Sequence, residues 1–240
     1  MLSELAGRLP DLPRWVETRA MLLSGRSELV GTPGPGPADF LVRGTDFGLF
    51  CVAGSPDLSP LPPAVAHHGG REVLCLPASA EAVAAQLREW TGSRAVIHSH
   101  PAPEAVTGGE DSPAGGVSML SPRDAGSLAH LPQALREELV TALGFTHVAA
   151  AFAEGLSVSF CYTASETETL WDISIDTLEP WRGRGLARAC CEFLIAHMSR
   201  HGKAPVWGAL EQNAASMKMA ERLGFVPVDE LVVFERGQKA

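Results

Sequence analysis

Two arginines and two glycines alternate in the segment Arg182-Gly183-Arg184-Gly185, and an apolar helical pattern begins with the next residue. The first turn of a helix leaves backbone N–H groups without partners, and the helix dipole makes that end positive. Glycine lets a phosphate approach the backbone closely, and arginine adds charge-assisted hydrogen bonds. No carboxylate interrupts residues 181–191. The segment therefore predicts a phosphate or pyrophosphate cradle, with an ordinary basic strand–loop–helix connection as the alternative.

The elements around this segment are those needed to present it. Residues 171–178 alternate apolar and polar side chains, which predicts a strand. Apolar residues recur at helical spacing from about 186 to 201, which predicts a helix. The loop between them is not a Walker loop, because no Gly-Lys-Ser/Thr follows, and it lacks the three spaced glycines of a Rossmann fingerprint. A strand over 205–210 and a helix after Asn213 are expected to follow.

Composition limits the kind of partner. The 240 residues are 45% hydrophobic and 20% charged, as is usual for a globular protein with a buried core. A formal net charge of −9 argues against nucleic acid or an anionic membrane as the main partner and is compatible with a cationic amine. No apolar run has the length of a membrane span and no export signal is apparent, so we expect a cytoplasmic protein. The five cysteines, without a CxxC pair, are expected to be free thiols.

A stretch rich in proline, glycine and small polar residues near the middle of the chain suggests a division into parts. We expect a smaller α/β domain over 1–105, a linker or mobile loop over 106–116, and a second domain over 117–240. A strand–helix–strand pattern over 71–100 predicts a βαβ-like unit in the first domain. The sequence shows no internal repeat, and it leaves a homodimer open.

The segment from Arg182 to Ala187 resembles the Gln/Arg-x-x-Gly-x-Gly/Ala signature of the GNAT superfamily of N-acetyltransferases. Residues 209–225 resemble a later element of that family, in which an asparagine opens a helix that ends in Leu-Gly-Phe. Here Asn213 would cap this helix and Gly224 would end it. The resemblance covers the C-terminal half. It implies an α/β (α+β) fold with a mixed, mostly antiparallel central sheet flanked by helices, and acetyl-coenzyme A as cosubstrate, bound by its pyrophosphate.

The resemblance also implies direct transfer, in which the acceptor amine attacks the thioester without an acyl-enzyme. In the family the strand before the cradle splays from its neighbour, and its backbone binds the pantetheine arm and stabilises the oxyanion. The matching region here lies near Asp176–Leu178. The residues expected to bind the cosubstrate are Asp176, Thr177, Leu178, Arg182, Gly183, Arg184, Gly185, Leu186, Ala187, Asn213 and Ser216.

A general base must take a proton from the incoming ammonium. Asp172 and Asp176 share a strand face by alternation and are the favoured candidates. Glu211 follows the next strand, and Glu166 and Glu168 precede the first. A chain of water molecules is the alternative to a single residue.

Many members of the family carry a tyrosine in the last helix that protonates the leaving thiolate. The matching position in this sequence is Ala220, and the only tyrosine is Tyr162. Ser216 lies one helical turn earlier and is a candidate donor, although packing near Asn213 or the cofactor is the favoured explanation of this residue. The missing tyrosine motivates a second hypothesis, a coenzyme A-binding regulator without catalysis.

A third hypothesis comes from His98 and His100, which point the same way on a predicted strand and so could bind zinc. With Ser121 and Asp124 they resemble the motif of JAMM/MPN-type zinc isopeptidases, but with a longer gap. Ser121 and the following proline are also explained as the start of a helix. His197 and His201 are spaced as a helical i, i+4 pair, but no third ligand is apparent, so no metal site is predicted.

Overall fold

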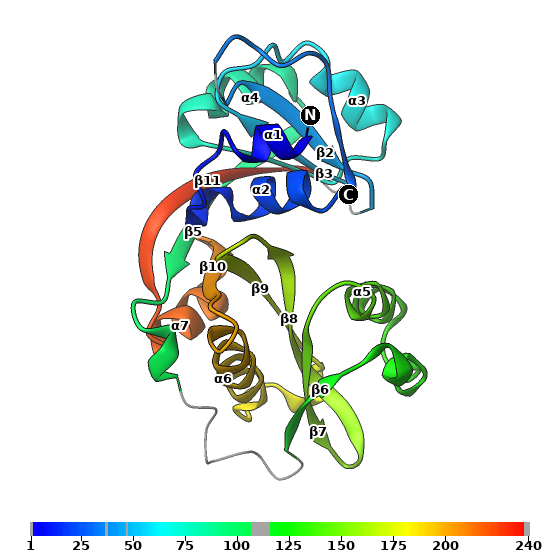
Figure 1. Cartoon of the computed structure of the whole chain (residues 1–240). Helices are drawn as coiled ribbons and strands as arrows, with labels where there is room; N and C mark the ends of the chain where they lie inside the picture. Colours follow the sequence, from blue (N-terminus) through cyan, green and yellow to red (C-terminus); the bar gives the residue numbers. More distant parts are fainter. Residues whose placement is uncertain (1, 37, 47, 107–115, 238–240) are drawn as a thin grey trace. The chain divides into compact units, whose positions relative to one another are not determined.

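The structure is a computed structural model that describes residues 2–36, 38–46, 48–106 and 116–237 (Figure 1). The chain divides into two compact units. Unit 1 comprises Met1–His98, Gly208–Lys218 and Pro227–Ala240, and unit 2 comprises Ser99–Trp207 and Met219–Val226. The chain first passes between units at Ser99, whereas the sequence suggested a boundary within 106–116. Residues 107–115 of that predicted linker lie outside the described residues.

Unit 1 is a sheet with helices on both faces. Its strands follow the order β1-β2-β3-β4-β11-β5. They are β1 (Ser27–Leu29), β2 (Phe40–Gly44), β3 (Leu49–Ala53), β4 (Glu72–Cys75), β5 (Trp90–Ser99) and β11 (Val226–Arg236). The helices are α1 (Leu2–Ala6), η1 (Pro13–Trp15), α2 (Val16–Leu23), α3 (Leu61–His67), η2 (Pro77–Ser79) and α4 (Ala80–Gln86). The pairs β1/β2, β2/β3 and β4/β11 are antiparallel, whereas β3 and β4 are parallel.

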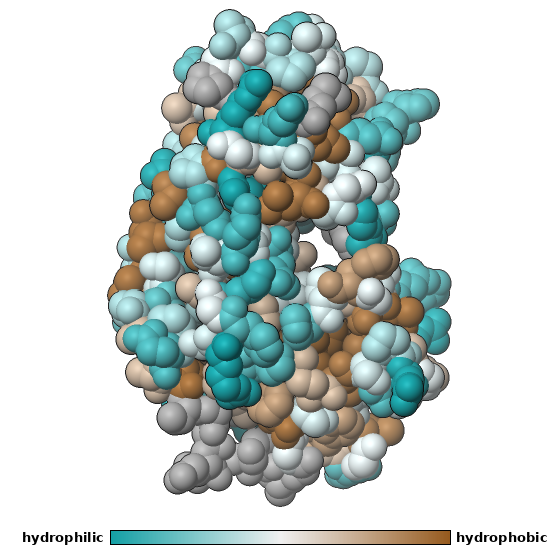
Figure 2. Space-filling model, in the orientation of Figure 1, coloured by the Kyte–Doolittle hydropathy of each residue, from teal (hydrophilic) through white to brown (hydrophobic). Residues whose placement is uncertain are grey.

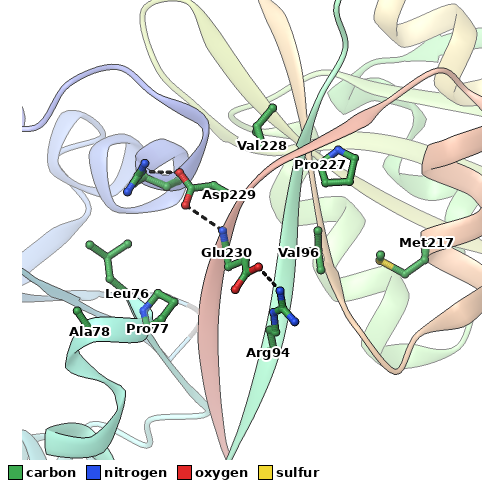
Figure 3. A pocket seen from close by; sticks show the side chains of 11 residues that line it. Leu76, Pro77, Ala78, Arg94, Val96, Met217, Pro227, Val228, Asp229 and Glu230 are labelled. Carbon is green, nitrogen blue, oxygen red and sulfur yellow. Dashed lines mark hydrogen bonds and ion pairs between the residues drawn. The ribbon is translucent and has the colours of Figure 1, made fainter.

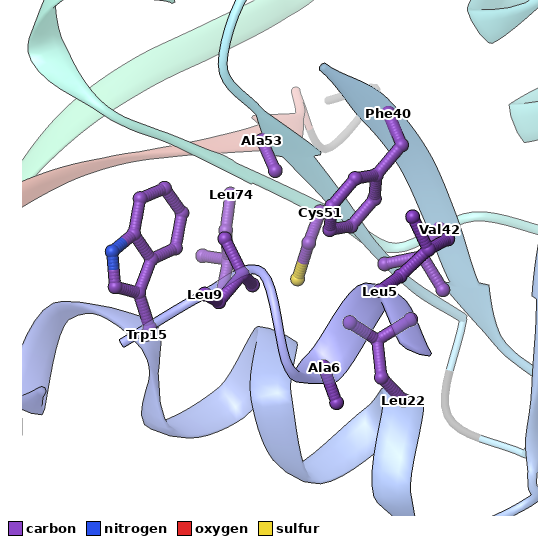
Figure 4. Close-up of a cluster of buried hydrophobic side chains, with 10 residues drawn as sticks. All are labelled: Leu5, Ala6, Leu9, Trp15, Leu22, Phe40, Val42, Cys51, Ala53 and Leu74. Carbon is purple, nitrogen blue, oxygen red and sulfur yellow. The ribbon is translucent and has the colours of Figure 1, made fainter. Parts of the chain in front are cut away.

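Alternation along the strands of unit 1 produces two cores, one on each face of the sheet. Phe40 and Val42 of β2 point toward α1 and α2, where they share a core with Leu5 and Leu22 (Figure 4). The intervening Leu41 points to the other face. There the core is completed by side chains from β3, β4, α3 and α4: Phe50, Val52, Val73, Cys75, Leu61, Val65, Val83 and Leu87.

Unit 2 contains the segment with the alternating arginines and glycines. Its strands follow the order β10-β9-β8-β7-β6. They are β6 (Val117–Leu120), β7 (Val148–Ala153), β8 (Leu156–Glu166), β9 (Leu170–Thr177) and β10 (Ala204–Leu210), the last of which ends in unit 1. The helices are η3 (Pro103–Ala105), η4 (Pro122–Leu128), α5 (Gln133–Leu143), η5 (Glu179–Trp181), α6 (Leu186–Ser199) and α7 (Ala214–Arg222), which passes from unit 1 into unit 2.

The two long helices of unit 2 pack on opposite faces of its sheet (Figure 1). Leu139 and Leu143 of α5 lie in a core with Phe160 and Tyr162 of β8. The residue between these two on β8, Cys161, points to the other face, where Cys191 of α6 interacts with it. The predicted fold class, a mixed and mostly antiparallel sheet flanked by helices, is confirmed: only β9/β10 is parallel among the strand pairs of unit 2 whose register is described.

The two units repeat one topological pattern. In unit 1, β2 and β3 are antiparallel, and α3 connects β3 to its parallel neighbour β4. In unit 2, β8 and β9 are antiparallel, and α6 connects β9 to its parallel neighbour β10. The sequence shows no such repeat, because the two crossovers have unrelated residues.

The surface and the thiols agree with a globular protein. Within the described parts of the chain, no helix has both the length and the apolar composition needed to cross a membrane. On the face drawn in Figure 2, hydrophobic residues lie among hydrophilic ones. The five cysteines are all free, as the sequence predicted, and the structure places each of them in a buried position.

Candidate cosubstrate-binding site

Strands β9 and β10 are paired over only part of their length. The parallel register joins Leu170 to Ala204 and ends with Asp172 opposite Val206. Strand β9 then continues through Ile173 to Thr177, still paired with β8 on its other side. At the end of β9, the edge on the side of β10 therefore lies outside the described parallel ladder. This is the arrangement expected of the splayed strand in the resemblance.

The register shows which backbone groups point to this open edge. Residues of an antiparallel strand direct their N–H and C=O groups alternately to one neighbour and the other. The N–H of Leu178 donates to the carbonyl oxygen of Val158, 2.9 Å away, so Leu178 faces β8. By alternation the backbone N–H and C=O groups of Asp176 also point to β8, whereas those of Ile175 and Thr177 point to the open edge. Of the three residues predicted to contact the pantetheine arm, Thr177 is the one whose backbone has the required direction.

The cradle is a glycine turn at the start of α6. Gly183 has a φ of 74° and Gly185 a φ of 78°, both in the left-handed region that favours glycine. Gly185 is the N-cap residue, and no side chain caps the helix there. A Cβ built on either glycine would have no heavy atom within 4 Å, so the space before the helix is open. The first amide groups of α6 therefore have no side-chain cap, and the glycines before them leave room on their side-chain faces for an anion to approach.

Buried and partly buried side chains hold this turn in place. Leu186 at the start of α6 is buried, and the N–H of Ala189 donates to the carbonyl of Gly185. Nε of Arg182 donates to the carbonyl oxygen of Thr177 at 3.1 Å, which ties the turn to the end of β9. The guanidinium of Arg184 lies over the ring of Trp181, 4.6 Å from its centroid. Both arginines remain exposed, so their other N–H groups can meet a phosphate.

The helix that follows β10 begins and ends as its sequence predicts. Oδ1 of Asn213 accepts a hydrogen bond from the N–H of Ser216 at 3.1 Å, which caps α7. At the other end Gly224 has a φ of 87°, and the N–H of Phe225 donates to the carbonyl of Ala220. This is a Schellman ending. The hydroxyl of Ser216 is half-buried on this helix, and its predicted role as a donor stays a prediction.

Two of the predicted carboxylates lie on β9. Asp172 is only 8% exposed and is opposite Val206 in the last pair of the parallel ladder. Asp176 lies at the far end of the strand, where its Oδ2 accepts a hydrogen bond from the hydroxyl of Tyr162 at 3.0 Å. Burial raises the pKa of Asp176, with a further contribution from Glu138, while Tyr162 and Arg182 oppose the rise. A raised pKa makes this carboxylate a better proton acceptor near neutral pH.

The remaining candidate bases have other partners. Glu211 lies in unit 1 and forms an ion pair with Arg94, at 3.3 Å between Nη1 and Oε1. Oε1 of Glu166 lies 2.6 Å from Nζ of Lys203. Glu168 is exposed between β8 and β9. Their candidacy as the base remains a prediction, and the geometry of β9 favours Asp172 and Asp176 over them.

Sequence reasoning missed Glu138 and the role of Tyr162. The hydroxyl of Tyr162 lies 2.7 Å from Oε1 of Glu138 on α5, as well as beside Asp176 on β9. The single tyrosine of the chain was a visible signal, but its two partners are 24 and 14 residues away. A contact between residues so far apart in the sequence cannot be predicted from a local pattern.

Of the two histidines in the zinc hypothesis, His100 is engaged in hydrogen bonds within the fold, and His98 is buried. Nε2 of His100 donates to the carbonyl oxygen of Leu223 at 2.9 Å, and Nδ1 accepts from the N–H of Ala102 at 3.2 Å. Both ring nitrogens are therefore engaged. Oδ2 of Asp124 accepts from the N–H and the hydroxyl of Ser121, both at 2.7 Å, in a capping box. Among the residues that the structure describes, no three His, Cys, Asp or Glu side chains form a group that could hold a metal ion.

A second histidine cluster lies at the other end of α6. The ring centroids of His197 and His201 are 4.7 Å apart, and His147 lies 5.3 Å from His197. His147 was not expected near this pair, because it lies before β7, fifty residues earlier in the chain. Burial and the neighbouring cations lower the pKa of His197.

Unit 1 has a cavity of its own, of about 760 Å³ (Figure 3). Its apolar wall includes Leu76, Val96 and Met217. Its charged groups are already paired, Arg14 with Asp229 and Arg94 with Glu230. None of the residues predicted from the sequence to bind the cosubstrate lines this cavity.

Comparison with known proteins places these features in a family. Residues 142–234 match the family model described as GNAT acetyltransferase. That range includes β9, the glycine turn, α6 and α7. No curated protein matches the sequence. The splayed strand and the anion cradle that the resemblance implied both fall within this matched range. The resemblance to the GNAT superfamily that the sequence suggested for the C-terminal half is thereby confirmed over residues 142–234.

Solved structures share the fold across the whole chain. A GCN5-related N-acetyltransferase-like protein from Streptococcus suis matches with a TM-score of 0.69 and 18% identity, covering 98% of this chain and 96% of that one. An acetyltransferase of the GNAT family from Novosphingobium aromaticivorans matches with a TM-score of 0.61 and 15% identity, covering 95% and 98%. A tandem GNAT protein from the clavulanic acid biosynthesis pathway matches with a TM-score of 0.57 and 15% identity, covering 100% and 94%. At these identities the likeness shows the fold.

Proposed function

We propose that this protein transfers the acetyl group of acetyl-coenzyme A directly to an amine. The observation that carries the proposal is the turn of Gly183 and Gly185, which opens the first amides of α6 to an anion directly after the unpaired edge of β9. The match to the GNAT acetyltransferase family supports the choice of cosubstrate. Acetyl-coenzyme A supplies an activated thioester, and the residues described above supply its binding site.

Groups of this chain would bind the cosubstrate, stabilise the developing negative charge and accept a proton. The amides at the start of α6, with Arg182 and Arg184, would bind the pyrophosphate. The backbone of Ile175 and Thr177 would bind the pantetheine arm and place an N–H donor where negative charge develops on the thioester oxygen. Asp176, with its raised pKa, would accept the proton of the acceptor ammonium. The formal net charge of −9 suits a cationic acceptor, either a small amine or a peptide amino group.

A titration of coenzyme A into purified variants tests the cradle. Arg182→Ala removes a charge-assisted hydrogen bond and is expected to weaken the affinity about tenfold to a hundredfold. Gly185→Glu should weaken it further, because it places a side chain at a φ of 78° and adds a negative charge. Arg200→Ala is the matched control, because it removes the same charge from just after the opposite end of α6. Unchanged affinity in the first two variants would contradict the proposal.

A regulator that binds coenzyme A without catalysis is the second candidate function. It is favoured by Ala220, which is fully buried. At this position many family members carry the tyrosine that protonates the leaving thiolate. Release of free thiol in the presence of a panel of amines separates the two candidates. Turnover above the rate of spontaneous hydrolysis with any amine supports the enzyme, and tight binding without turnover supports the regulator.

A further inference from the structure

The hydroxyl of Tyr162 lies between two carboxyl groups, although it has a single proton to donate. Its Oη is 2.7 Å from Oε1 of Glu138 and 3.0 Å from Oδ2 of Asp176. If both carboxyl groups are ionised, only one of these contacts is a hydrogen bond, and the other places a carboxylate against the lone pairs of the phenol. One additional proton turns both contacts into hydrogen bonds. The three side chains together therefore favour the uptake of one proton.

The three groups connect the end of β9 with the surface of unit 2 at α5. Asp176 on β9 is half-buried and lies next to Thr177, whose backbone faces the open edge. Tyr162 on β8 is only 4% exposed, and Glu138 on α5 is exposed. Arg182 is the remaining charged group that acts on Asp176. Burial and both carboxylates raise the pKa of Tyr162, so its hydroxyl stays protonated at neutral pH.

We propose that Asp176, Tyr162 and Glu138 form a proton relay that carries the proton of the acceptor ammonium from the open edge of β9 to solvent. The inference rests on the proposed function. It adds Tyr162 and Glu138 as residues that act through Asp176, and it limits the acceptor to amines that arrive protonated.

The proton moves along the relay in three steps, and in each step every bond that breaks is matched by one that forms. An N–H bond of the ammonium breaks and an O–H bond forms on Asp176, which leaves the amine lone pair free to attack the thioester. The O–H bond of Asp176 then breaks as a new bond forms to Oη of Tyr162, while the original Oη–H bond breaks and an O–H bond forms on Glu138. Glu138 releases this proton to water, and the hydroxyl of Tyr162 reorients toward it for the next cycle.

Titration of the carboxyl groups tests the coupling without any acetyl transfer. The full-length protein is labelled with ¹³C at the aspartate carboxyl carbons, and Asp176→Asn assigns the signal of Asp176. In Glu138→Gln we expect the midpoint of Asp176 to fall, because the neighbouring charge is gone and the amide can donate to Tyr162 in its place. Glu137→Gln is the matched control, one residue away on the exposed side of α5, and should leave the midpoint unchanged. Identical midpoints in the wild type and Glu138→Gln would overturn the relay.

Kinetics with an accepted amine test the relay in action. Tyr162→Phe keeps the ring in the core and removes the connecting hydroxyl, so kcat should fall about a hundredfold with the affinity for coenzyme A unchanged. Glu138→Gln should move the acidic limb of the kcat/KM profile to lower pH, and Glu137→Gln should not. An active wild type whose Tyr162→Phe and Glu138→Gln variants have unaltered profiles overturns the relay alone. A wild type that acetylates no amine overturns the proposed function as well.

Discussion

His100 could be either a zinc ligand or a structural residue, and the structure distinguishes between these two roles. On a strand, two histidines two positions apart could bind zinc. In unit 2 the ring of His100 instead joins the Schellman ending of α7 to the segment after β5, through Leu223 on one side and Ala102 on the other. The edge of its ring also meets Phe225, with centroids 5.2 Å apart. This histidine therefore stabilises the end of a helix.

Replacement of His100 by alanine should destabilise the protein without affecting any metal. The change removes two hydrogen bonds in a half-buried position, so we expect a loss of about 1–3 kcal/mol in the free energy of unfolding. His67→Ala, on an exposed position of α3, should cost less than about 0.5 kcal/mol. Denaturant unfolding measures both. Zinc that copurifies in stoichiometric amounts and is lost with His100 would contradict this account.

What could be predicted about single residues depends on how local their contacts are. Asn213 and Gly224 were predicted correctly, because a cap and a helix ending involve residues three to five apart. Glu138 was missed, because its contact with Tyr162 exists only after α5 has packed on β8. The positive φ of Gly183 and Gly185 agrees with the predicted turn, and it follows from two glycines in a basic loop before a helix.

Helix α6 combines two opposite environments along its length. Its first turn offers free amides to an anion, whereas its last turn and the residues that follow carry His197, Arg200 and His201. Positive charge near a helix C-terminus suits the dipole. A proton on His197 is nevertheless opposed by the neighbouring His147, His201 and Arg200. Glu166 lies close to this cluster, with its Oε2 3.9 Å from Nδ1 of His147.

The contribution of His197 to the free energy of unfolding should therefore fall on mild acidification. The pKa of His197 is lowered in the folded state by burial first, and then by His147, His201 and Arg200. A group whose folded pKa is depressed contributes its full stability above its unfolded value, near 6.5, and loses that contribution as the pH falls below it. Urea unfolding at pH 7.5, 6.5 and 5.5 measures the effect. His197→Gln should flatten the dependence, and a slope identical to that of the wild type would refute the assignment.

The whole molecule contains one topological pattern twice, but only one copy has the chemistry of a cradle. In unit 2 the crossover helix follows two glycines and two arginines. In unit 1 the helix α3 follows Pro60 and begins Leu61-Pro62-Pro63, so that proline replaces amide donors at the start of the helix. The loop before it also carries Asp57, whose carboxylate accepts hydrogen bonds from the N–H and hydroxyl of Ser59. A fixed negative charge and missing donors both oppose an anion there.

We therefore expect one molecule of coenzyme A to bind per chain. Calorimetry on the full-length protein should give a stoichiometry near one, and Arg182→Ala should weaken the whole of the binding signal, because no second site remains to contribute. Asp57→Asn, which removes the negative charge from the crossover of unit 1, should leave the stoichiometry unchanged, since the prolines still lack their N–H groups. Two bound equivalents, or a strong site that persists in Arg182→Ala, would mean that the repeat in unit 1 has kept a cradle that its sequence does not suggest.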